Sequence, residues 1–322
     1  MAKQIIITGV AGFIGYNLST YLLNNSYSIL GIDNLNNDLE SKKIKKDRLL
    51  KLKKYNKFKF IKRNIKDKNL ISRIKISANY FIHLAASVSV RDSINNPDKF
   101  IENNIKSFLN ILEIVKNNNL KLVYASSSSI YNDKINKIPF SENEKIISPN
   151  SIYGFTKLSN EKIAKIYNEQ FGIKSIGLRF FTVYGDYPRL DMAIFKFIDA
   201  IYKNKTIKLF NHGKNKRDFT HVLDICEYIK NIIESKKNKF PDYEIFNIGS
   251  TNSLSTQDLV KKIEKITKKK ARIEMKKSIY GENVTTKSSI KKIRFNYGKN
   301  KQVSINEGLI KTINWYKIYN NL

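Results

Sequence analysis

Short apolar runs alternate with longer amphipathic stretches through the first half of the chain. Runs rich in isoleucine, leucine, valine and aromatic residues occupy residues 5–7, 28–33, 57–61, 80–83, 120–125 and 175–180. Helical spacing of apolar residues covers residues 12–23, 97–116 and 153–170. Continuous apolar runs are typical of strands buried on both faces, and strands separated by helices favour a parallel sheet. The pattern therefore predicts an α/β fold with a doubly wound parallel sheet.

The pattern loosens after Gly185. A helix is expected from about residue 189 to about residue 204, and the later elements are shorter and separated by more turns. We expect residues 1–185 to form the large domain. Residues 186–322 should form mainly a smaller α/β lobe, with some elements returning to the main domain. Glycine (13) and proline (5) are too scarce to indicate a disordered linker.

Lysine and arginine outnumber aspartate and glutamate by 59 to 28, a formal charge of +31. A charge of this size suggests a nucleic-acid or anionic-membrane partner. The basic residues are nevertheless spread along the whole chain, which indicates a compositional bias more than a built patch. The densest run, residues 42–57, is predicted to be a solvated amphipathic helix with Ile44, Leu49, Leu50 and Leu52 on its apolar side. We therefore expect neither a nucleic-acid nor a membrane partner.

The rare residues limit the available chemistry. The single cysteine, Cys226, excludes an internal disulfide and is expected in the core of an apolar helix. The three histidines, His83, His212 and His221, lack metal-ligand spacing, so no metal site is predicted. No apolar run reaches the ~18 residues of a membrane span, and a strand follows the first residues directly, which argues against a cleavable signal. A reducing, cytoplasmic location is therefore expected.

A glycine-rich turn follows the first predicted strand. Gly9, Gly12 and Gly15 have the spacing G-x-x-G-x-x-G and open the first predicted helix. Such a turn lets the backbone approach a pyrophosphate, which the N–H groups of the helix N-terminus then bind. Asp33 ends the second strand, where a carboxylate accepts hydrogen bonds from a ribose diol and repels a 2′-phosphate. These residues predict a Rossmann-like dinucleotide site that prefers NAD to NADP.

Tyr153 and Lys157 are four residues apart and therefore lie on one helical face. There the lysine ammonium can lower the pKa of the phenol, which suits proton transfer. A run of four serines, Ser126 to Ser129, precedes this pair in the chain. The pair alone is weak evidence in a lysine-rich chain, but its order after the glycine turn and the serine run favours a redox active site.

Together these segments resemble the extended short-chain dehydrogenase/reductase family of NAD-dependent sugar epimerases and dehydratases. The resemblance covers roughly residues 4 to 318 and is nearest to the UDP-glucuronate 4-epimerase branch. Besides the glycine turn, it is carried by residues 33–36, 83–86, 124–131, 178–185, 189–193, 217–222 and 307–316. It implies NAD as the cofactor, a UDP-sugar as the substrate, and a C-terminal lobe that binds this substrate.

The resemblance also implies a role for individual residues. Ser127, Tyr153 and Lys157 match the catalytic trio. The expected cofactor site consists of Gly9, Gly12, Phe13, Ile14, Gly15, Asp33, Asn34, Asn64, Ile65, Leu84, Ala85, Ala86, Asn104, Tyr153, Lys157 and Phe180. The expected substrate site consists of Ser87, Ser128, Ser129, Thr182, Arg189 and Arg217.

The chain departs from the family pattern at several positions. Asn64 replaces a frequent aspartate beside the adenine, and Asn132 replaces a usual glycine. Residues 186–188 and Leu190 differ around Arg189, and residues 280–284 match the late substrate-contacting stretch only loosely. The last two differences bear on the identity of the sugar and leave the redox core unchanged.

The resemblance implies inversion of a UDP-sugar at C4 through a transient 4-keto intermediate, most simply UDP-glucuronate to UDP-galacturonate. Dehydratases of the family carry an Asp-Glu pair after the catalytic Ser or Thr, and decarboxylating relatives carry a glutamate there. Here Ser128 and Ser129 occupy these positions, and neither is a strong acid or base. Dehydration and decarboxylation are therefore disfavoured.

Two other functions remain open. A UDP-N-acetylglucosamine or UDP-glucose 4-epimerase would use the same trio, although Thr182 favours the uronate because neutral-sugar epimerases often have asparagine there. A non-catalytic NAD-binding or RNA-binding protein on this fold is the remote alternative, suggested by the charge. The family also implies a homodimer formed by the helices near 97–116 and 153–170. Apolar residues of the first helix are expected to supply surplus surface for it: Phe100, Ile101, Ile105, Phe108, Ile111 and Leu112.

Overall fold

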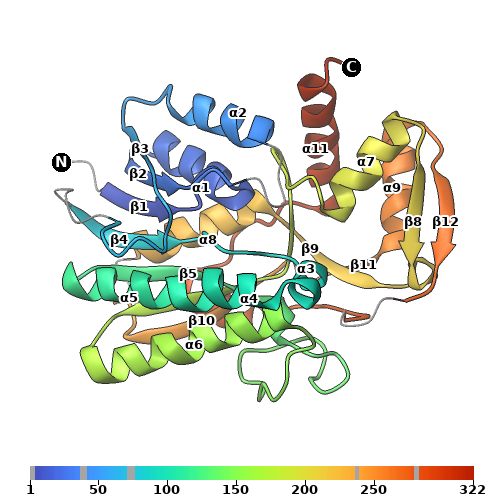
Figure 1. Ribbon diagram of the computed structural model, residues 1–322. Coiled ribbons are helices and arrows are strands. Elements are labelled where there is room, and N and C mark those ends of the chain that lie inside the picture. The colour runs from blue at the N-terminus through green and yellow to red at the C-terminus, as the bar shows by residue number, and fades with distance from the viewer. Residues whose placement is uncertain (1–3, 37–41, 71–76, 236–238, 279–282) are drawn as a thin grey trace.

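The computed structural model describes residues 4–36, 42–70, 77–235, 239–278 and 283–322. A seven-stranded parallel sheet in the order β10-β6-β5-β4-β1-β2-β3 forms its centre (Figure 1). The strands are β1 Gln4–Thr8, β2 Ser28–Asp33, β3 Phe58–Lys62, β4 Ala78–His83, β5 Lys121–Ser127, β6 Ser175–Phe180 and β10 Tyr243–Ile248. Most of their residues are buried, as expected of a sheet covered on both faces. The predicted doubly wound fold is confirmed.

Helices cover both faces of this sheet. One core joins the sheet to α1 Phe13–Asn24, α2 Lys42–Leu52, α8 Val222–Glu234 and α10 Lys291–Tyr297. A second core, on the opposite face, joins it to α5 Ser107–Asn117 and α6 Ile152–Phe171. Cys226 is buried in α8, as predicted. No helix among the described ranges is both long and apolar enough for a membrane span.

A smaller lobe lies beside the carboxyl ends of the central strands (Figure 1). Its elements are α7 Ala193–Tyr202, β8 Thr206–Phe210, α9 Thr256–Thr267, β12 Arg272–Lys276 and α11 Ile305–Tyr319. A three-stranded sheet of β7 Thr182–Tyr184, β9 Lys216–His221 and β11 Ser253–Ser255 connects the two parts. β10 and α8 belong to the central sheet and its cover although they follow residue 185. The boundary at residue 185 stays a prediction.

The predicted helix 97–116 is interrupted. It consists of α4 Pro97–Phe100, a π-helical segment Ile101–Lys106, and α5, and α3 Val90–Asn95 precedes it. The π segment carries Asn104, which is buried. A π-helical turn holds more residues than an α-helical turn, so it changes the direction of the side chains without ending the helix. Such turns occur often at functional sites.

One sequence expectation about apolar surface was wrong and another was wrong in part. Leu50, expected on the apolar side of α2, is 61% exposed, whereas Arg48 on the same helix is fully buried. Of the six residues expected to give surplus apolar surface, four are 0% exposed within one chain: Phe100, Phe108, Ile111 and Leu112. The core of the single chain already uses these four, whereas Ile101 and Ile105 are partly exposed.

Candidate active site

A cavity of about 740 Å³ lies at the carboxyl ends of the central strands and extends under the smaller lobe. It is lined by the glycine turn, the loops after β2 and β4, the serine turn after β5 and the start of α6. The lobe contributes residues of β7, α7, β8 and β9. Ligands of open α/β sheets bind at this edge, where connections leave in opposite directions.

The glycine turn forms a close cradle at one end of the cavity. Gly9 has φ +72°, and a Cβ there would meet the backbone nitrogen of Ala85 at 2.8 Å. A Cβ on Gly15 would meet the carbonyl oxygen of Gly9 at 2.1 Å. Gly12 is the N-cap of α1, whose first N–H groups therefore open toward the cavity. The cradle fits a dinucleotide pyrophosphate, because it combines close backbone approach with a helix N-terminus.

Asp33 lies beside the cradle and is buried. Its Oδ2 accepts a hydrogen bond from the Ala11 nitrogen at 3.0 Å, and its Oδ1 accepts one from the Leu35 nitrogen at 2.8 Å. Each carboxylate oxygen keeps a further lone pair for a ligand. Asp33 thus fixes the glycine turn and lines the cavity at once, as a ribose-binding carboxylate must.

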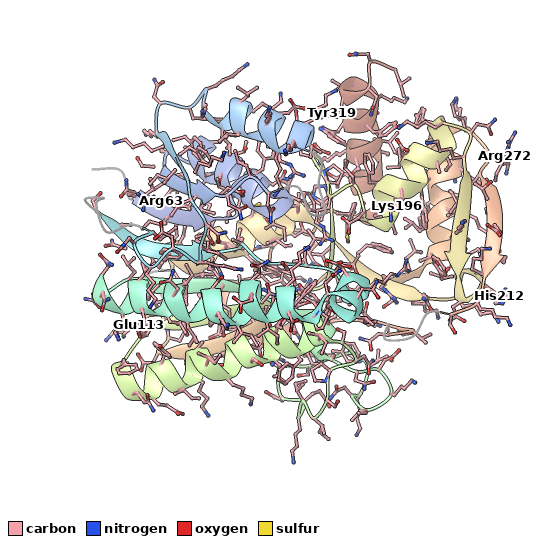
Figure 2. All side chains as sticks on the ribbon, in the orientation of Figure 1. Arg63, Glu113, Lys196, His212, Arg272 and Tyr319 are labelled. Carbon is pink, nitrogen blue, oxygen red and sulfur yellow. The ribbon has the colours of Figure 1, made fainter. Side chains whose placement is uncertain are left out.

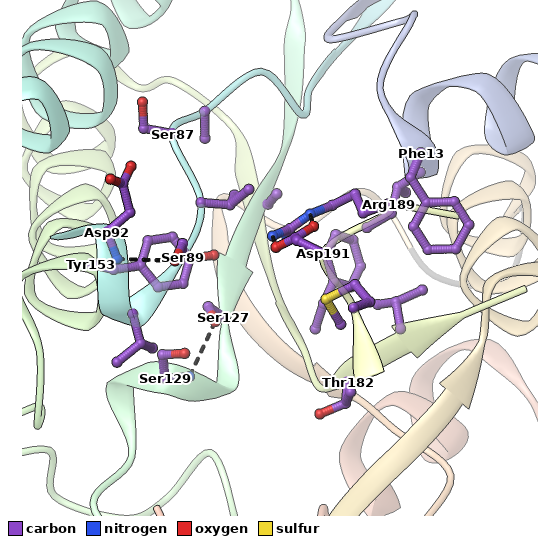
Figure 3. Close-up of a pocket in the computed structure, with 18 of the residues that line it drawn as sticks. Phe13, Ser87, Ser89, Asp92, Ser127, Ser129, Tyr153, Thr182, Arg189 and Asp191 are labelled. Atoms are coloured by element: carbon purple, nitrogen blue, oxygen red, sulfur yellow. Dashed lines mark hydrogen bonds and ion pairs between the residues drawn. The ribbon is translucent and has the colours of Figure 1, made fainter. Parts of the chain in front are cut away.

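Ser127, Tyr153 and Lys157 line the cavity where β5 ends near the first turns of α6, and Figure 3 shows Ser127 and Tyr153 on the same side of it. Ser151 caps α6 by accepting from the Gly154 nitrogen at 3.1 Å, and Ser127 Oγ accepts from the Ser129 nitrogen at 3.1 Å. These caps fix the relative position of the serine and the tyrosine.

The ionisation of this trio differs from the expectation in one respect. Burial raises the pKa of the Tyr153 phenol, and a hydrogen bond with Ser127 and the positive charge of Arg189 oppose this rise. Lys157 was expected to lower that pKa, but its Nζ instead donates to the carbonyl oxygen of Ala125 at 2.9 Å. Burial lowers the pKa of Lys157 to about 8.

Every residue predicted for the cofactor or the substrate lines the cavity, with the exception of Asn104. Asn104 lies behind the wall: its Oδ1 accepts from the Ser87 nitrogen at 2.8 Å, and its Nδ2 donates to Thr156 Oγ1 at 3.0 Å. It therefore holds the loop after β4 against α6 and does not itself face the cavity. The π-helical segment provides this inward position.

Hydroxyl groups and arginines complete the lining around the trio. Ser128 and Ser129 follow Ser127 on the same turn, and Thr182 lies on β7. Arg189 reaches in from the opposite side (Figure 3) and forms an ion pair with Asp191, with Nε–Oδ1 at 3.0 Å and Nη2–Oδ2 at 2.5 Å. Arg217, on β9, lines the cavity under the smaller lobe.

The cavity is strongly basic. Among the described residues that line it, nine are lysines or arginines and three are aspartates. Several of these cations give no signal in the sequence, because basic residues are common throughout the chain: Lys45, Arg63, Arg91, Lys99, Lys196 and Lys208. A cavity with this excess attracts ligands that carry phosphates. The loosely matching stretch is described only from Asn283 on, and Asn283 and Thr286 line the cavity; residues 280–282 lie outside the described ranges.

Comparison with known proteins agrees with this geometry. Residues 5–249 match the NAD dependent epimerase/dehydratase family. A UDP-glucuronate 4-epimerase of Thermodesulfobacterium geofontis is 38% identical, over 97% of this chain and 95% of its own. The structure of a UDP-glucuronic acid 4-epimerase from Bacillus cereus in complex with UDP-glucuronic acid and NAD superposes with a TM-score of 0.91. It is 33% identical and covers 98% of this chain and 99% of its own.

A more distant relative has another sugar in its name. The UDP-N-acetylglucosamine 4-epimerase of Methanobrevibacter ruminantium M1, in complex with UDP-N-acetylmuramic acid, superposes with a TM-score of 0.86 at 25% identity, covering 99% of both chains. The family match covers more than half of the chain and includes the cradle and the trio. The chain therefore belongs to the NAD-dependent epimerase/dehydratase family, and it is an isomerase that uses NAD.

Proposed function

We propose that this protein inverts C4 of UDP-glucuronate to give UDP-galacturonate. The observation that carries the proposal is the position of Tyr153 and Ser127 in the same cavity as the glycine cradle, beside Ser128 and Ser129 and opposite Arg189. The similarity to UDP-glucuronate 4-epimerases supports this substrate.

Each group of residues in the site has a separate role. Bound NAD supplies the acceptor that takes a hydride from C4 and returns it. Tyr153 accepts the proton of the sugar 4-hydroxyl and later gives it back. Ser127 forms a hydrogen bond with the same sugar oxygen. The basic lining, including Arg217, suits the diphosphate. After oxidation the sugar must turn over so that the hydride reaches its other face, and the size of the cavity suits that motion.

The carboxylates of the cavity are already engaged by other groups, which disfavours dehydration and decarboxylation. Among its described lining residues these are Asp33, Asp92 and Asp191. Asp33 accepts from backbone nitrogens, Asp92 is paired with Lys99 at 3.4 Å, and Asp191 is paired with Arg189. Beside Tyr153 stand Ser128 and Ser129, which cannot remove a proton from C5. Neutral donors there can orient a sugar carboxylate without promoting loss of CO₂.

A UDP-N-acetylglucosamine or UDP-glucose 4-epimerase is the second candidate, because the trio is the same and such a relative shares the fold. The test is to incubate the purified protein separately with UDP-glucuronate, UDP-glucose and UDP-N-acetylglucosamine, and to identify the products by NMR. We expect UDP-galacturonate from the first. Inversion of another sugar while UDP-glucuronate stays unchanged would overturn the substrate assignment. Absence of any conversion, with salt-dependent RNA binding, would favour the non-catalytic alternative.

We further propose a homodimer formed through α5 and α6. The residues that support it are those left exposed on these helices: Leu109 at 37%, Phe155 at 49%, Ile166 at 47% and Phe171 at 50%. Their burial between two copies would remove this apolar surface from water. Light scattering at micromolar concentration should give twice the mass of 37.4 kDa, and Phe155→Glu with Ile166→Glu should give the single chain. A wild-type monomer would refute the dimer.

A further inference from the structure

The fully buried Arg48 connects two parts of the cavity that are far apart in sequence. Its Nη1 donates to the carbonyl oxygen of Ala11, in the glycine turn, at 2.8 Å. Its Nη2 donates to the carbonyl oxygens of Tyr187 at 2.7 Å and Pro188 at 3.0 Å. Pro188 immediately precedes Arg189. One guanidinium thus joins the dinucleotide cradle to the turn that carries the arginine of the opposite wall.

A second hydrogen bond joins the same two parts. Asn17, on α1, donates from Nδ2 to the carbonyl oxygen of Asp186 at 3.0 Å and to that of Phe13 at 3.0 Å. The helix that begins at the glycine turn is therefore attached directly to the start of the 186–188 turn.

Aromatic rings hold the middle of this turn. Tyr187 has φ +51°, a backbone conformation that costs energy for a residue with a side chain. Its ring lies 4.8 Å from that of Tyr16 on α1 and 5.1 Å from that of Trp315 on α11, measured between centroids. Tyr319, labelled on α11 in Figure 2, donates to Asp47 Oδ2 at 2.6 Å and so attaches α11 to α2, where Asp47 immediately precedes Arg48. The surrounding helices therefore fix a strained turn.

The hydrogen bonds form one continuous series. Asp33, which lines the cofactor end, accepts from the Ala11 nitrogen, and the Ala11 carbonyl accepts from Arg48. Arg48 in turn holds the turn that ends at Arg189. Arg189 is near enough to Tyr153 for its charge to act on the phenol. A shift of the 186–188 turn would therefore be felt at the reacting end of the cavity.

We propose that Arg48 is a positioning residue that sets the place of Arg189 in the cavity and thereby the preference for a sugar that bears a carboxylate. This rests on the proposed function, since of the candidate sugars only the uronate has a carboxylate, which the neutral hydroxyl groups would orient and the charge of Arg189 would attract. A guanidinium suits the task because its planar fork directs several donors at fixed angles, and here two of its nitrogens bond three carbonyl oxygens. A lysine at this position would keep the charge but has a single nitrogen.

The experiment compares Arg48→Met, Arg48→Lys, Arg189→Ala, Asn17→Ala and the double variant Arg48→Met/Arg189→Ala as full-length holoenzymes. Calorimetry gives the dissociation constants of UDP, UDP-glucose and UDP-glucuronate, and the readout is the preference for UDP-glucuronate over UDP-glucose. Arg294→Met is the matched control, because Arg294 donates to Gln302 at 2.9 Å and does not line the cavity. Thermal unfolding reports whether each variant is folded.

We expect Arg48→Met to lower the preference by roughly tenfold, as a lost charge-assisted hydrogen bond would, with the UDP affinity nearly unchanged. Arg48→Lys should keep part of the preference for UDP-glucuronate. Asn17→Ala should lower this preference less, and it should fold because Asn17 is only half-buried. The double variant should lose no more than Arg189→Ala alone, because both changes remove the same interaction. Equal losses for UDP and UDP-glucuronate, or additive losses in the double variant, would overturn the proposal.

A crystal structure of Arg48→Met separates this proposal from the choice of substrate. We expect the 186–188 turn to be displaced and the Arg189–Asp191 ion pair to be broken or moved. If both stay in place, Arg48 does not position Arg189. If the wild-type protein shows no preference for UDP-glucuronate while the turn moves in the variant, the substrate assignment fails and the positioning role stands.

Discussion

The first turn of α6 lies directly against the serine turn that ends β5: a Cβ on Gly154 would meet the carbonyl oxygen of Ser129 at 2.2 Å. Gly154 follows Tyr153, and Ser129 follows Ser127 by two residues, so this contact sets the distance between the two predicted catalytic hydroxyls. A glycine is required because the atom in the way belongs to backbone and cannot turn aside.

Gly154→Ala should therefore lower kcat far more than it changes the substrate KM. The added methyl group must push α6 away from β5, and overpacking of this kind costs about 1–3 kcal/mol of stability. Gly172→Ala, at the C-cap of the same helix, is the control, since a Cβ there meets nothing within 4 Å although φ is +67°. It should lower the melting temperature and leave kcat unchanged. Equal losses of kcat in both variants would show that the contact at Gly154 has no special role.

Tyr153→Phe should reduce kcat by about 10²–10⁴-fold, the usual contribution of a general acid–base group, with little change in UDP-sugar binding. Tyr167→Phe removes a hydroxyl from the same helix, where Tyr167 donates to Glu113 at 2.9 Å away from the cavity. This control should keep its activity. Rates from NMR of the product and affinities from calorimetry separate the two effects, and a Tyr153→Phe variant with more than about a tenth of wild-type kcat would remove the phenol from the chemistry.

Asp33→Asn should weaken NAD binding and reduce the preference for NAD over NADP. The substitution removes the negative charge that repels a 2′-phosphate. It also gives an N–H donor to a position where both carboxylate oxygens accept from backbone nitrogens, so the turn itself should loosen. Fluorescence titration of the variant with each dinucleotide measures both effects. An unchanged ratio of the two affinities would contradict the role of Asp33.

His83 should make the protein less stable in acid. Burial, together with the charge of Lys157, lowers the pKa of His83 from 6.5 to about 3 in the folded chain, where its Nδ1 is 2.8 Å from Thr8 Oγ1. Between these two values the unfolded chain binds the proton and the folded chain does not, so stability falls as pH drops below 6.5, by up to about 1.4 kcal/mol per pH unit. His83→Asn removes the titrating ring and should lose less stability than the wild type between pH 6.5 and pH 4. Melting temperatures across this range test the difference, and parallel curves would refute it.

The sequence was most informative where chemistry restricts the residue type. Gly9 and Gly15 are recognisable because no side chain fits their positions, and Tyr153 with Lys157 because a helix brings residues four apart together. The strands were found because β1, β2 and β6 are buried on both faces and therefore read as apolar runs.

Other features depend on contacts between distant segments and have no local signal. Arg48 stands among lysines in a run that reads as solvated, yet it is the basic residue that the fold buries, because its acceptors are carbonyl groups of residues 11, 187 and 188. Asn104 was expected to face the cofactor, but the π-helical segment turns it toward Ser87 and Thr156. The sequence indicated a functional role for Asn104, but only the packing of the helix determines which residues it hydrogen bonds to.

We expect the hydrogen removed from C4 of the sugar to return to the same carbon on its other face, while Tyr153 handles only the hydroxyl proton. The most direct measurement is to incubate the wild-type protein in ordinary water with UDP-glucuronate that carries deuterium at C4, and to follow the product by NMR. We predict UDP-galacturonate that has kept its deuterium at C4. A product in which this deuterium has been replaced by solvent hydrogen, or an unchanged substrate, would contradict the account.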